Sequence, residues 1–243
     1  MIIKFLSEYL KYIGNQAGNE RNKSILQLLP LDRNAKYLDV GCGDGTLTLK
    51  RAKKIGTKKI YGCDLVDDYI SEAKKKNIFI KKADLNNKLP FKDTEFDIIT
   101  ATQVIEHLSN VDMFASEIYR ILKPEGIAII STENLAAWHN IFALLLGLQP
   151  STGPWISKRF SVGFHPLNNE YTDKEIPDSL IESNPHTRVM TYCSMKKLFQ
   201  LYNFDIIKEC MIGYYPFPPA LAKILAGIDR WHCVNIILKL QKK

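Results

Sequence analysis

The segment that most constrains the fold is residues 37–46, which read YLDVGCGDGT. A short apolar run, typical of a strand buried in a parallel sheet, is followed by three glycines at alternate positions. Residues 47–55 can then continue as a helix that buries Leu47, Leu49, Ala52 and Ile55. A strand, a glycine turn and a helix in this order place backbone N–H groups where a polar ligand can approach without meeting side chains. The segment therefore predicts a site for a nucleoside-bearing cofactor.

The remaining pattern predicts an α/β fold for residues 1–243 as a single domain. Strands alternate with helices, as in βαβ units with a buried parallel sheet. These strands are expected at residues 59–63, 78–80, 96–101 and 127–131, with two late strands at 204–213 and 232–240.

Two regions fall outside this alternation. Residues 1–35 predict an N-terminal helical cap made of two helices, at 3–13 and 21–29, separated by a break between Gly14 and Gly18. Residues 134–190 contain several Pro and Gly breaks and are expected to be an insertion that forms a substrate lid. This insertion is therefore the expected source of acceptor specificity.

Composition limits the classes of partner. The 243 residues carry a formal net charge of +7, but much of it lies in lysine runs such as 74–76, and solvated surface lysines explain these better than nucleic acid binding does. The five cysteines show no CxxC spacing and are expected to be reduced thiols in a cytoplasmic protein. The N-terminal residues do not resemble a secretion signal, and no apolar run reaches the length of a membrane span.

Acidic residues beside the glycines indicate which cofactor binds. Asp39 and Asp44 flank the turn, where they would repel a diphosphate but suit a ligand that carries an ammonium and a sulfonium. The dinucleotide fingerprint also requires its third glycine where Thr46 stands, which disfavours an NAD-dependent oxidoreductase. Asp64 ends the second strand and could accept hydrogen bonds from ribose hydroxyls. Asp84, after the third strand, could bind the adenine amine, with apolar contacts from Leu65 and Leu85.

Three motifs together resemble a known family. Residues 38–45 (LDVGCGDG), 96–108 (FDII followed by VIEHL) and 122–126 (LKPEG) resemble the corresponding motifs of class I S-adenosylmethionine-dependent methyltransferases. The resemblance implies a Rossmann-like seven-stranded sheet of order 3-2-1-4-5-7-6, with strand 7 antiparallel and helices on both faces. It implies S-adenosylmethionine as the cofactor, bound by Asp39, Gly41, Cys42, Gly43, Gly45, Asp64, Leu65, Asp84, Leu85, Thr102 and Gln103. Arg21 is either a contact to the cofactor carboxylate or a helix-surface charge.

Candidate catalytic residues follow the fourth and fifth strands. His107 is a candidate base, with packing on the cofactor turn as the alternative, and Glu133 directly follows the fifth strand, where it could meet the acceptor. The pair at 106 and 107 also resembles quinone-biosynthesis O-methyltransferases, which carry an acid three residues earlier. Here that position is Gln103, a poor metal ligand, so we predict no metal. His139, His165 and His186 could border the acceptor pocket.

The apolar helix expected at 135–148 gives information on the class of acceptor. It is either buried as a lid, or it contacts a lipid or prenyl tail or a membrane surface, so peripheral membrane contact stays an alternative. Together these observations predict a methyltransferase that acts on a small-molecule or lipid-linked acceptor, most readily at oxygen. An RNA methyltransferase and a non-catalytic S-adenosylmethionine-binding protein of the same fold are the alternatives.

Overall fold

The structure is a computed structural model that describes residues 2–157, 159, 160, 162, 163 and 185–243. His165, expected to border the acceptor pocket, lies outside the described residues. No described helix is both long enough and apolar enough to cross a bilayer.

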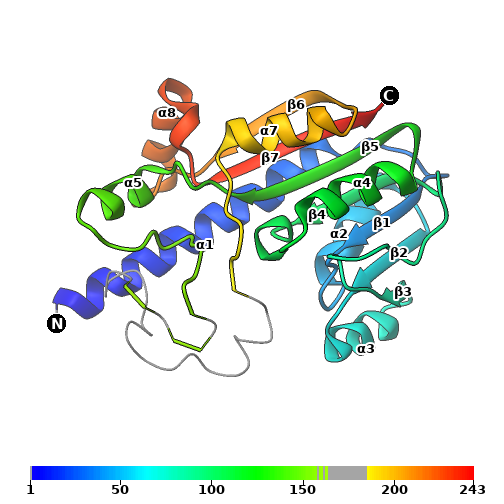
Figure 1. Cartoon of the computed structure of the whole chain (residues 1–243), viewed down its shortest axis with the longest axis horizontal. Coiled ribbons are helices and arrows are strands. Elements are labelled where there is room, and N and C mark those ends of the chain that lie inside the picture. Colours follow the sequence, from blue (N-terminus) through cyan, green and yellow to red (C-terminus); the bar gives the residue numbers. More distant parts are fainter. Residues whose placement is uncertain (1, 158, 161, 164–184) are drawn as a thin grey trace. The chain divides into compact units, whose positions relative to one another are not determined.

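A seven-stranded sheet has the order β3-β2-β1-β4-β5-β7-β6, with β7 antiparallel (Figure 1). The order implied by the family resemblance is therefore confirmed. The strands are β1 (Lys36–Val40), β2 (Lys59–Asp64), β3 (Phe79–Lys82), β4 (Phe96–Thr102), β5 (Leu122–Glu133), β6 (Phe204–Ile212) and β7 (Asn235–Lys242). β1 pairs in parallel with both β2 and β4, and β4 pairs in parallel with β5.

The helices connect these strands. They are α1 (Ile2–Leu28), α2 (Thr46–Ile55), α3 (Asp67–Lys75), α4 (Val111–Ile121), α5 (Trp138–Leu145), α7 (Tyr192–Leu201) and α8 (Pro219–Ile228), with short 3₁₀ turns η1 (Ile105–His107) and η2 (Arg230–His232). Because parallel strands are joined by right-handed crossovers, the order 3-2-1-4-5 puts α2 and α3 on one face of the sheet and α4 on the other.

The central strands are buried on both faces, which explains their nearly continuous apolar sequences. All but the first residue of β1 are buried, and β4 is buried at five of seven positions. Phe96 and Ile99 of β4 have no exposed surface. At roughly 25 cal/mol per Å² of apolar area, burying each such side chain contributes about 1.5–3 kcal/mol.

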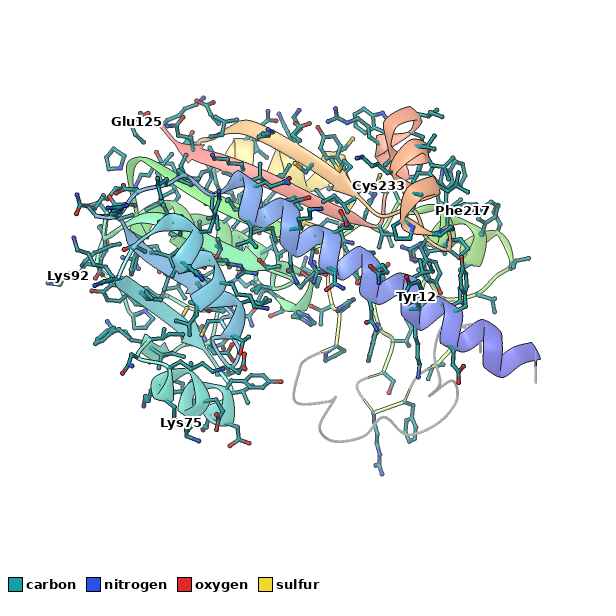
Figure 2. The ribbon with its side chains drawn as sticks, turned by 180° about the vertical axis from the view of Figure 1, so that it is seen from behind. Tyr12, Lys75, Lys92, Glu125, Phe217 and Cys233 are labelled. Atoms are coloured by element: carbon teal, nitrogen blue, oxygen red, sulfur yellow. The ribbon has the colours of Figure 1, made fainter. Side chains whose placement is uncertain are left out.

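The N-terminal region differs from the expectation of two helices, because α1 is one continuous helix of 27 residues. Gly14 and Gly18 lie inside it, although each costs about 1 kcal/mol relative to Ala in a helix interior. The intrinsic preference for a break is therefore overcome by the surroundings of the helix. Tyr12, in the same helix, is exposed (Figure 2).

The chain divides into two compact units. The first contains residues 1–23, 132–192 and 210–236, and the second contains 24–131, 193–209 and 237–243. The expected insertion at 134–190 falls in the first unit, together with residues 2–23 of α1. The glycine turn and Asp64, Asp84, Thr102 and Gln103 fall in the second.

The apolar helix expected at 135–148 is α5 (Trp138–Leu145) and its continuation. Against the described residues it is not buried on every face: Phe142, Leu144, Leu145 and Leu146 have between 58% and 75% of their surface exposed. In the same unit, Ile224 and Ile228 of α8 are also exposed. The expectation that this helix is buried therefore does not hold for these side chains, and its role as a lid stays a prediction.

Candidate functional site

The glycine turn joins β1 to α2 in the second unit. Gly41 and Cys42 both donate their backbone N–H to the carbonyl of Cys63, at 2.9 and 3.1 Å, so the turn is fixed to the end of β2. Gly45 N donates to Cys42 O at 3.1 Å and closes the turn. The Cys42 side chain is buried, so this residue can offer a cofactor little more than its backbone.

The three glycines have different roles. All three have positive φ, which side chains rarely adopt. A Cβ on Gly41 would collide with Val104, and one on Gly45 would collide with Ile78 and Ala73, so these two allow close packing. A Cβ on Gly43 would meet nothing within 4 Å. Gly43 is therefore the point where the backbone of the turn is open to a ligand.

The Asp39 carboxylate, which the sequence interpretation assigned to the cofactor, is buried and hydrogen-bonded within the protein. It is 1% exposed and accepts hydrogen bonds from Thr48 Oγ1 and Thr100 Oγ1, both at 2.6 Å. Arg51 Nη1 lies 2.7 Å from Oδ1 and 2.9 Å from Oδ2. Because the charge of Asp39 is buried and paired, this residue has a structural role beneath the turn, and its contact with the methionine moiety stays a prediction.

The residues that face Asp39 also correct the expected buried face of α2. That face consists of Thr48, Arg51, Ala52 and Ile55, while Leu47 is exposed. A buried carboxylate requires polar partners, and Thr48 and Arg51 supply them from successive turns of the helix.

Asp44 is exposed and is also paired. Lys76 Nζ lies 2.7 Å from Asp44 Oδ2, 2.7 Å from Asp44 O and 2.8 Å from Thr46 Oγ1. These hydrogen bonds from Lys76 and from Thr46 lower the pKa of Asp44 to about 2. Since both carboxylates beside the glycines have cationic partners, their combined charge is a weaker reason for a cationic ligand than the sequence alone suggested.

Asp64 ends β2 beside the open glycine. Its Oδ2 accepts the N–H of Gly43 at 2.8 Å, and its Oδ1 accepts those of Leu65 and Val66 at 2.8 and 3.1 Å. An ionised carboxylate has about four acceptor positions, so these three bonds leave about one, at Oδ2. The structure thus places Asp64 next to Gly43 with room for one further donor.

Asp84, Leu65 and Leu85 lie in the loops that follow β3 and β2. Asp84 accepts hydrogen bonds from Asn86 N at 2.9 Å and from Asn87 Nδ2 at 2.8 Å, which shape its own loop. Asn86 Oδ1 in turn accepts the N–H of Ser109 at 2.8 Å and joins this loop to the one after η1. Leu65 is 45% exposed and Leu85 is half-buried, so both keep apolar surface for a ligand.

Two buried hydroxyls stand at the ends of β4 and β5. Thr102 and Ser131 are register partners, and the Oγ atom of each is buried without a hydrogen-bond partner among the described residues. Gln103, the next residue after β4, has a φ of 55° and donates its N–H to Ser131 O at 2.9 Å. Sequence reasoning identified Thr102 and Gln103 but missed Ser131, whose only signal was its place at the end of a strand.

The first unit contains a separate cavity of about 300 Å³. It is lined by Leu10, Lys11, Gly14, Ala17, Gly18, Arg21, Glu133, His139, Ser151, Thr152, Tyr215, Val234 and Asn235. Two of the residues named from the sequence, Glu133 and His139, therefore lie in its wall. Arg21 is there too, half-buried, and its Nη1 donates to Asn235 Oδ1 at 3.1 Å.

Glu133 is the acidic group of this cavity. Protein atoms surround it, and burial raises its pKa to about 7 although the nearby charge of Arg21 lowers it. About 28% of the side chain remains accessible to a water-sized probe, and we attribute this surface to the cavity. Glu133 therefore changes its protonation state near neutral pH, where a proton acceptor is most useful.

His139 and His186, two histidines of this unit, are neutral at pH 7. Burial lowers the pKa of His139 to about 4, and its Nδ1 is buried without a hydrogen-bond partner among the described residues. Burial also lowers the pKa of His186, although its Nδ1 contacts Thr152 O at 2.7 Å. His186 Nδ1 is 3.9 Å from Glu133 Oε2, but a neutral ring makes no ion pair. His107, in the second unit, is half-buried in η1, and its role as a base stays a prediction.

Comparison with known proteins agrees with this geometry. Residues 38–130 match a family described as a methyltransferase domain. The chain is 32% identical over 135 residues to a ubiquinone biosynthesis O-methyltransferase of Bartonella tribocorum, an alignment that covers 51% of each protein. It is 28% identical over 152 residues to a demethylmenaquinone methyltransferase of Listeria welshimeri, covering 57% of this chain and 63% of that protein. The chain thus matches only 51% and 63% of the lengths of these relatives.

A solved structure shares the fold. An S-adenosylmethionine-dependent methyltransferase from Mesorhizobium loti, 18% identical, has a TM-score of 0.60 and covers 90% of this chain and 96% of its own. Residues 38–130 match a methyltransferase domain, and the chain shares the fold of the class I S-adenosylmethionine-dependent methyltransferases. The cofactor that this class implies is S-adenosylmethionine.

The residues present fit this cofactor. Open space above Gly43, one acceptor position on Asp64, and the buried hydroxyls of Thr102 and Ser131 are polar features that protein groups leave unfilled in the described part of the chain. All four lie at or after the carboxyl ends of parallel strands, where open α/β sheets bind their ligands.

Proposed function

We propose that this protein transfers a methyl group from S-adenosylmethionine to an oxygen of a small-molecule or lipid-linked acceptor. The observation that carries the proposal is the pairing of Gly43 with Asp64. An open backbone position and a carboxylate with one acceptor position left lie 2.8 Å apart, N to Oδ2, at the end of β2. That combination suits a ribose hydroxyl beside a glycine turn.

Each part of the cofactor is assigned to residues whose open polar or apolar surface suits it. Gly43 and Asp64 would hold the ribose side, Leu65, Asp84 and Leu85 the adenine, and Thr102 with Gln103 and Ser131 the methionine end. Gly41 and Gly45 act by permitting the turn to pack closely. Asp39 acts indirectly, because it fixes β1 to α2 beneath the turn.

The chemistry needs few protein groups. The cofactor supplies a methyl group activated by its bond to a sulfonium. The protein aligns the acceptor, excludes water and, for a hydroxyl acceptor, takes up the proton that the oxygen loses. Glu133 is the better supported base, because its raised pKa of about 7 suits proton uptake at neutral pH. His107 remains the second candidate for this role.

The exposed apolar residues of α5 and α8 support the lipid-linked branch of the proposal. Leu145, Leu146 and Ile228 are each more than 70% exposed, which is unusual for side chains of this size. Contact with a lipid tail or with a membrane surface would cover them. The alternatives, an RNA methyltransferase and a non-catalytic S-adenosylmethionine-binding protein, have no comparable observation in their favour.

Calorimetry on the purified chain tests the cofactor. We expect S-adenosylmethionine and S-adenosylhomocysteine to bind and NAD to give no heat. Binding of NAD without binding of the sulfonium compound would overturn the proposal. Incubation with methyl-labelled cofactor and cell extract, followed by separation of lipids, RNA and small molecules, then tests the acceptor class. Label recovered only in RNA would favour the RNA alternative.

A further inference from the structure

One side of α5 is apolar and exposed. Phe142, Leu145 and Leu146 are spaced three and four residues apart, so they share one side of the helix. Each of them is between 58% and 75% exposed. Elsewhere on the same helix Asn140 and Ala143 are buried and hold α5 against the protein. A helix of a globular protein normally buries its apolar side, whereas α5 presents this one to the solvent.

α8 has the same kind of exposed side. Leu221, Ile224 and Ile228 follow one another at spacings of three and four residues, and Ile228 is 80% exposed. Of the residues between them, Ala222 is buried and Leu225 packs against the core of the first unit. α8 therefore also carries an apolar stripe that the described part of the chain leaves uncovered.

The two helices adjoin within the first unit (Figure 1). Trp138, the first residue of α5, donates its Nε1–H to Asp229 Oδ2 at 2.8 Å, directly after the end of α8. The Trp138 ring also packs on the core to which Leu225 and Ala226 of α8 contribute. The two exposed stripes are treated together as the α5–α8 face. This face consists of Phe142, Leu145, Leu146, Leu221, Ile224 and Ile228.

The exposed charges beside the α5–α8 face are positive. Residues 134–149, which contain α5, include no Asp, Glu, Lys or Arg. Residues 211–236, which contain α8, include two basic side chains, Lys223 in α8 and Arg230 in η2, and both are exposed. Lys223 directly precedes Ile224 of the face. The face therefore combines apolar side chains with neighbouring cations, as helices that bind membrane interfaces do.

The carboxylate of residues 211–236 is directed toward the protein. This residue, Asp229, accepts hydrogen bonds at Oδ2 from Trp138 Nε1 and Tyr214 OH, both at 2.8 Å. The same oxygen lies 2.7 Å from His232 Nδ1. These hydrogen bonds lower the pKa of Asp229 to about 2, although burial acts in the opposite direction. Because Asp229 is occupied with these partners, it does not balance the exposed charges of Lys223 and Arg230.

An exposed tryptophan accompanies these cations. Trp231 is 50% exposed, and the guanidinium carbon of Arg230 lies 5.9 Å from the centroid of its ring. Tryptophan is enriched where proteins meet the boundary between water and lipid, because its ring is apolar and its N–H is polar. Trp231 thus adds a residue suited to the same kind of partner.

We propose that the α5–α8 face docks on the surface of a membrane that contains anionic lipids. Its apolar side chains enter between the lipid headgroups, while Lys223 and Arg230 meet the lipid phosphates. Binding of this kind gains free energy from buried apolar area and from attraction to anionic lipids. The inference goes beyond the proposed function and does not rest on it, since docking requires neither the cofactor nor the acceptor.

A second copy of the chain is the other occupant to consider. In a two-fold symmetric contact the same surface is used by both copies, so the basic side chains of each would be buried against the α5–α8 face of the other. Among the described residues of this face and its neighbours, no exposed carboxylate stands ready to pair with Lys223 or Arg230. Unpaired like charges disfavour such a contact, whereas lipid phosphates supply the opposite charge. The membrane surface is therefore the favoured occupant.

Sedimentation of the full chain with vesicles tests the inference. The vesicles consist of phosphatidylcholine alone, or of phosphatidylcholine and phosphatidylglycerol in equal parts. Leu145→Asn and Ile228→Asn each replace an exposed apolar side chain by a polar one, and Leu31→Asn is the matched control because Leu31 and Leu145 are both 75% exposed. We expect the unaltered chain to bind the mixed vesicles, Leu145→Asn and Ile228→Asn each to weaken that binding about tenfold, and Leu31→Asn to leave it unchanged.

Lys223→Gln tests the contribution of charge. We expect it to weaken binding to the mixed vesicles about fivefold. Lys53→Gln, at an exposed position of α2, is the control, because a chain of formal net charge +7 is attracted to an anionic surface as a whole. Equal losses in Lys223→Gln and Lys53→Gln, with full binding retained by Leu145→Asn and Ile228→Asn, would reveal adsorption by net charge alone and overturn the inference.

Sedimentation velocity without vesicles tests the second copy. We expect the unaltered chain and Leu145→Asn to sediment alike at every concentration. A dimer that Leu145→Asn dissociates, together with no binding to either kind of vesicle, would overturn the inference in favour of a contact between two copies. Circular dichroism of each variant checks that these exposed substitutions leave the fold intact.

Discussion

Asp39 Oδ1 and Arg51 Nη1 lie 2.7 Å apart, and the two side chains are only 1% and 6% exposed. Thr48 and Thr100 add hydroxyl hydrogen bonds to the same carboxylate, and Tyr37 donates to or accepts from Thr100 Oγ1 at 2.7 Å. Burial alone would lower the pKa of Arg51, but the charge of Asp39 raises it, so the guanidinium stays charged. A buried ion pair beneath the glycine turn therefore joins β1 to α2, and the hydrogen bond from Thr100 adds β4.

Replacing Arg51 by Met should strongly destabilise the protein. The substitution removes the cation and leaves a buried carboxylate without its counter-charge, which typically costs about 3–5 kcal/mol. Urea unfolding followed by circular dichroism would measure it. Lys75→Ala is the matched control, because Lys75 pairs with Glu72 at the surface with 70% and 52% of the side chains exposed, and should change stability by less than about 1 kcal/mol (Figure 2). Equal effects of the two substitutions would contradict the role assigned to Arg51.

Gly43→Ala and Gly45→Ala should separate binding from folding. Both residues have positive φ, so either substitution carries a backbone cost of about 1–2 kcal/mol. Only Gly45→Ala adds a collision, with Ile78 and Ala73, and it should be the less stable protein. Gly43→Ala should remain folded but lose affinity for S-adenosylhomocysteine, because its methyl group projects into the open space. Thermal unfolding and calorimetry together check this, and the reverse ranking in both measurements would refute it.

Asp64→Asn should weaken binding of the cofactor by the free energy of one hydrogen bond. Three of about four acceptor positions of Asp64 are already used by backbone N–H groups, so one ribose hydroxyl is expected at Oδ2. A hydrogen bond to a charged group contributes roughly 1.5–3 kcal/mol, or about 10- to 150-fold in Kd. Calorimetry with S-adenosylhomocysteine measures the loss, and Asp68→Asn on the exposed surface of α3 serves as the control. A loss no larger than in the control would remove Asp64 from the ribose site.

The parts of the fold that local patterns determine were predictable. The sequence of strands and helices from β1 to β5 follows from apolar runs and turn residues, whereas the sheet order was implied by the family resemblance; the structure agrees with both. The continuity of α1 was not predictable, because Gly14 and Gly18 favour a break when only neighbouring residues are considered. Residues far along the chain approach the same helix closely: a Cβ added to Gly213 would lie 3.2 Å from the Ala17 side chain. Such tertiary packing offsets the cost of the glycines.

The candidate site also combines residues that the sequence could identify with contacts that it could not. Positions such as Gly43 and Asp64 are adjacent to strand ends and could be named from the sequence. The burial of Asp39 could not, because it depends on Thr100, which is 61 residues away. Nor could the cavity, since Arg21 and Asn235 come together in it across 214 residues. An alternating glycine pattern identifies a turn, but it does not reveal which neighbouring charges are already paired.

Glu133→Gln should make the protein more stable at high pH. Burial raises the pKa of Glu133 to about 7, so between about pH 4.5 and 7 the folded protein holds a proton that the unfolded chain has released. Stability therefore falls as the pH rises through this window and is constant above it. A shift of this size corresponds to about 3 kcal/mol at pH 8, and the neutral amide would avoid that cost. Urea unfolding at pH 5 and pH 8 should show a gain of that order for Glu133→Gln at pH 8 and a much smaller one at pH 5. Glu72→Gln, at an exposed position of α3, should show no such difference, and equal gains for Glu133→Gln at the two pH values would mean that Glu133 is ionised in the folded protein throughout.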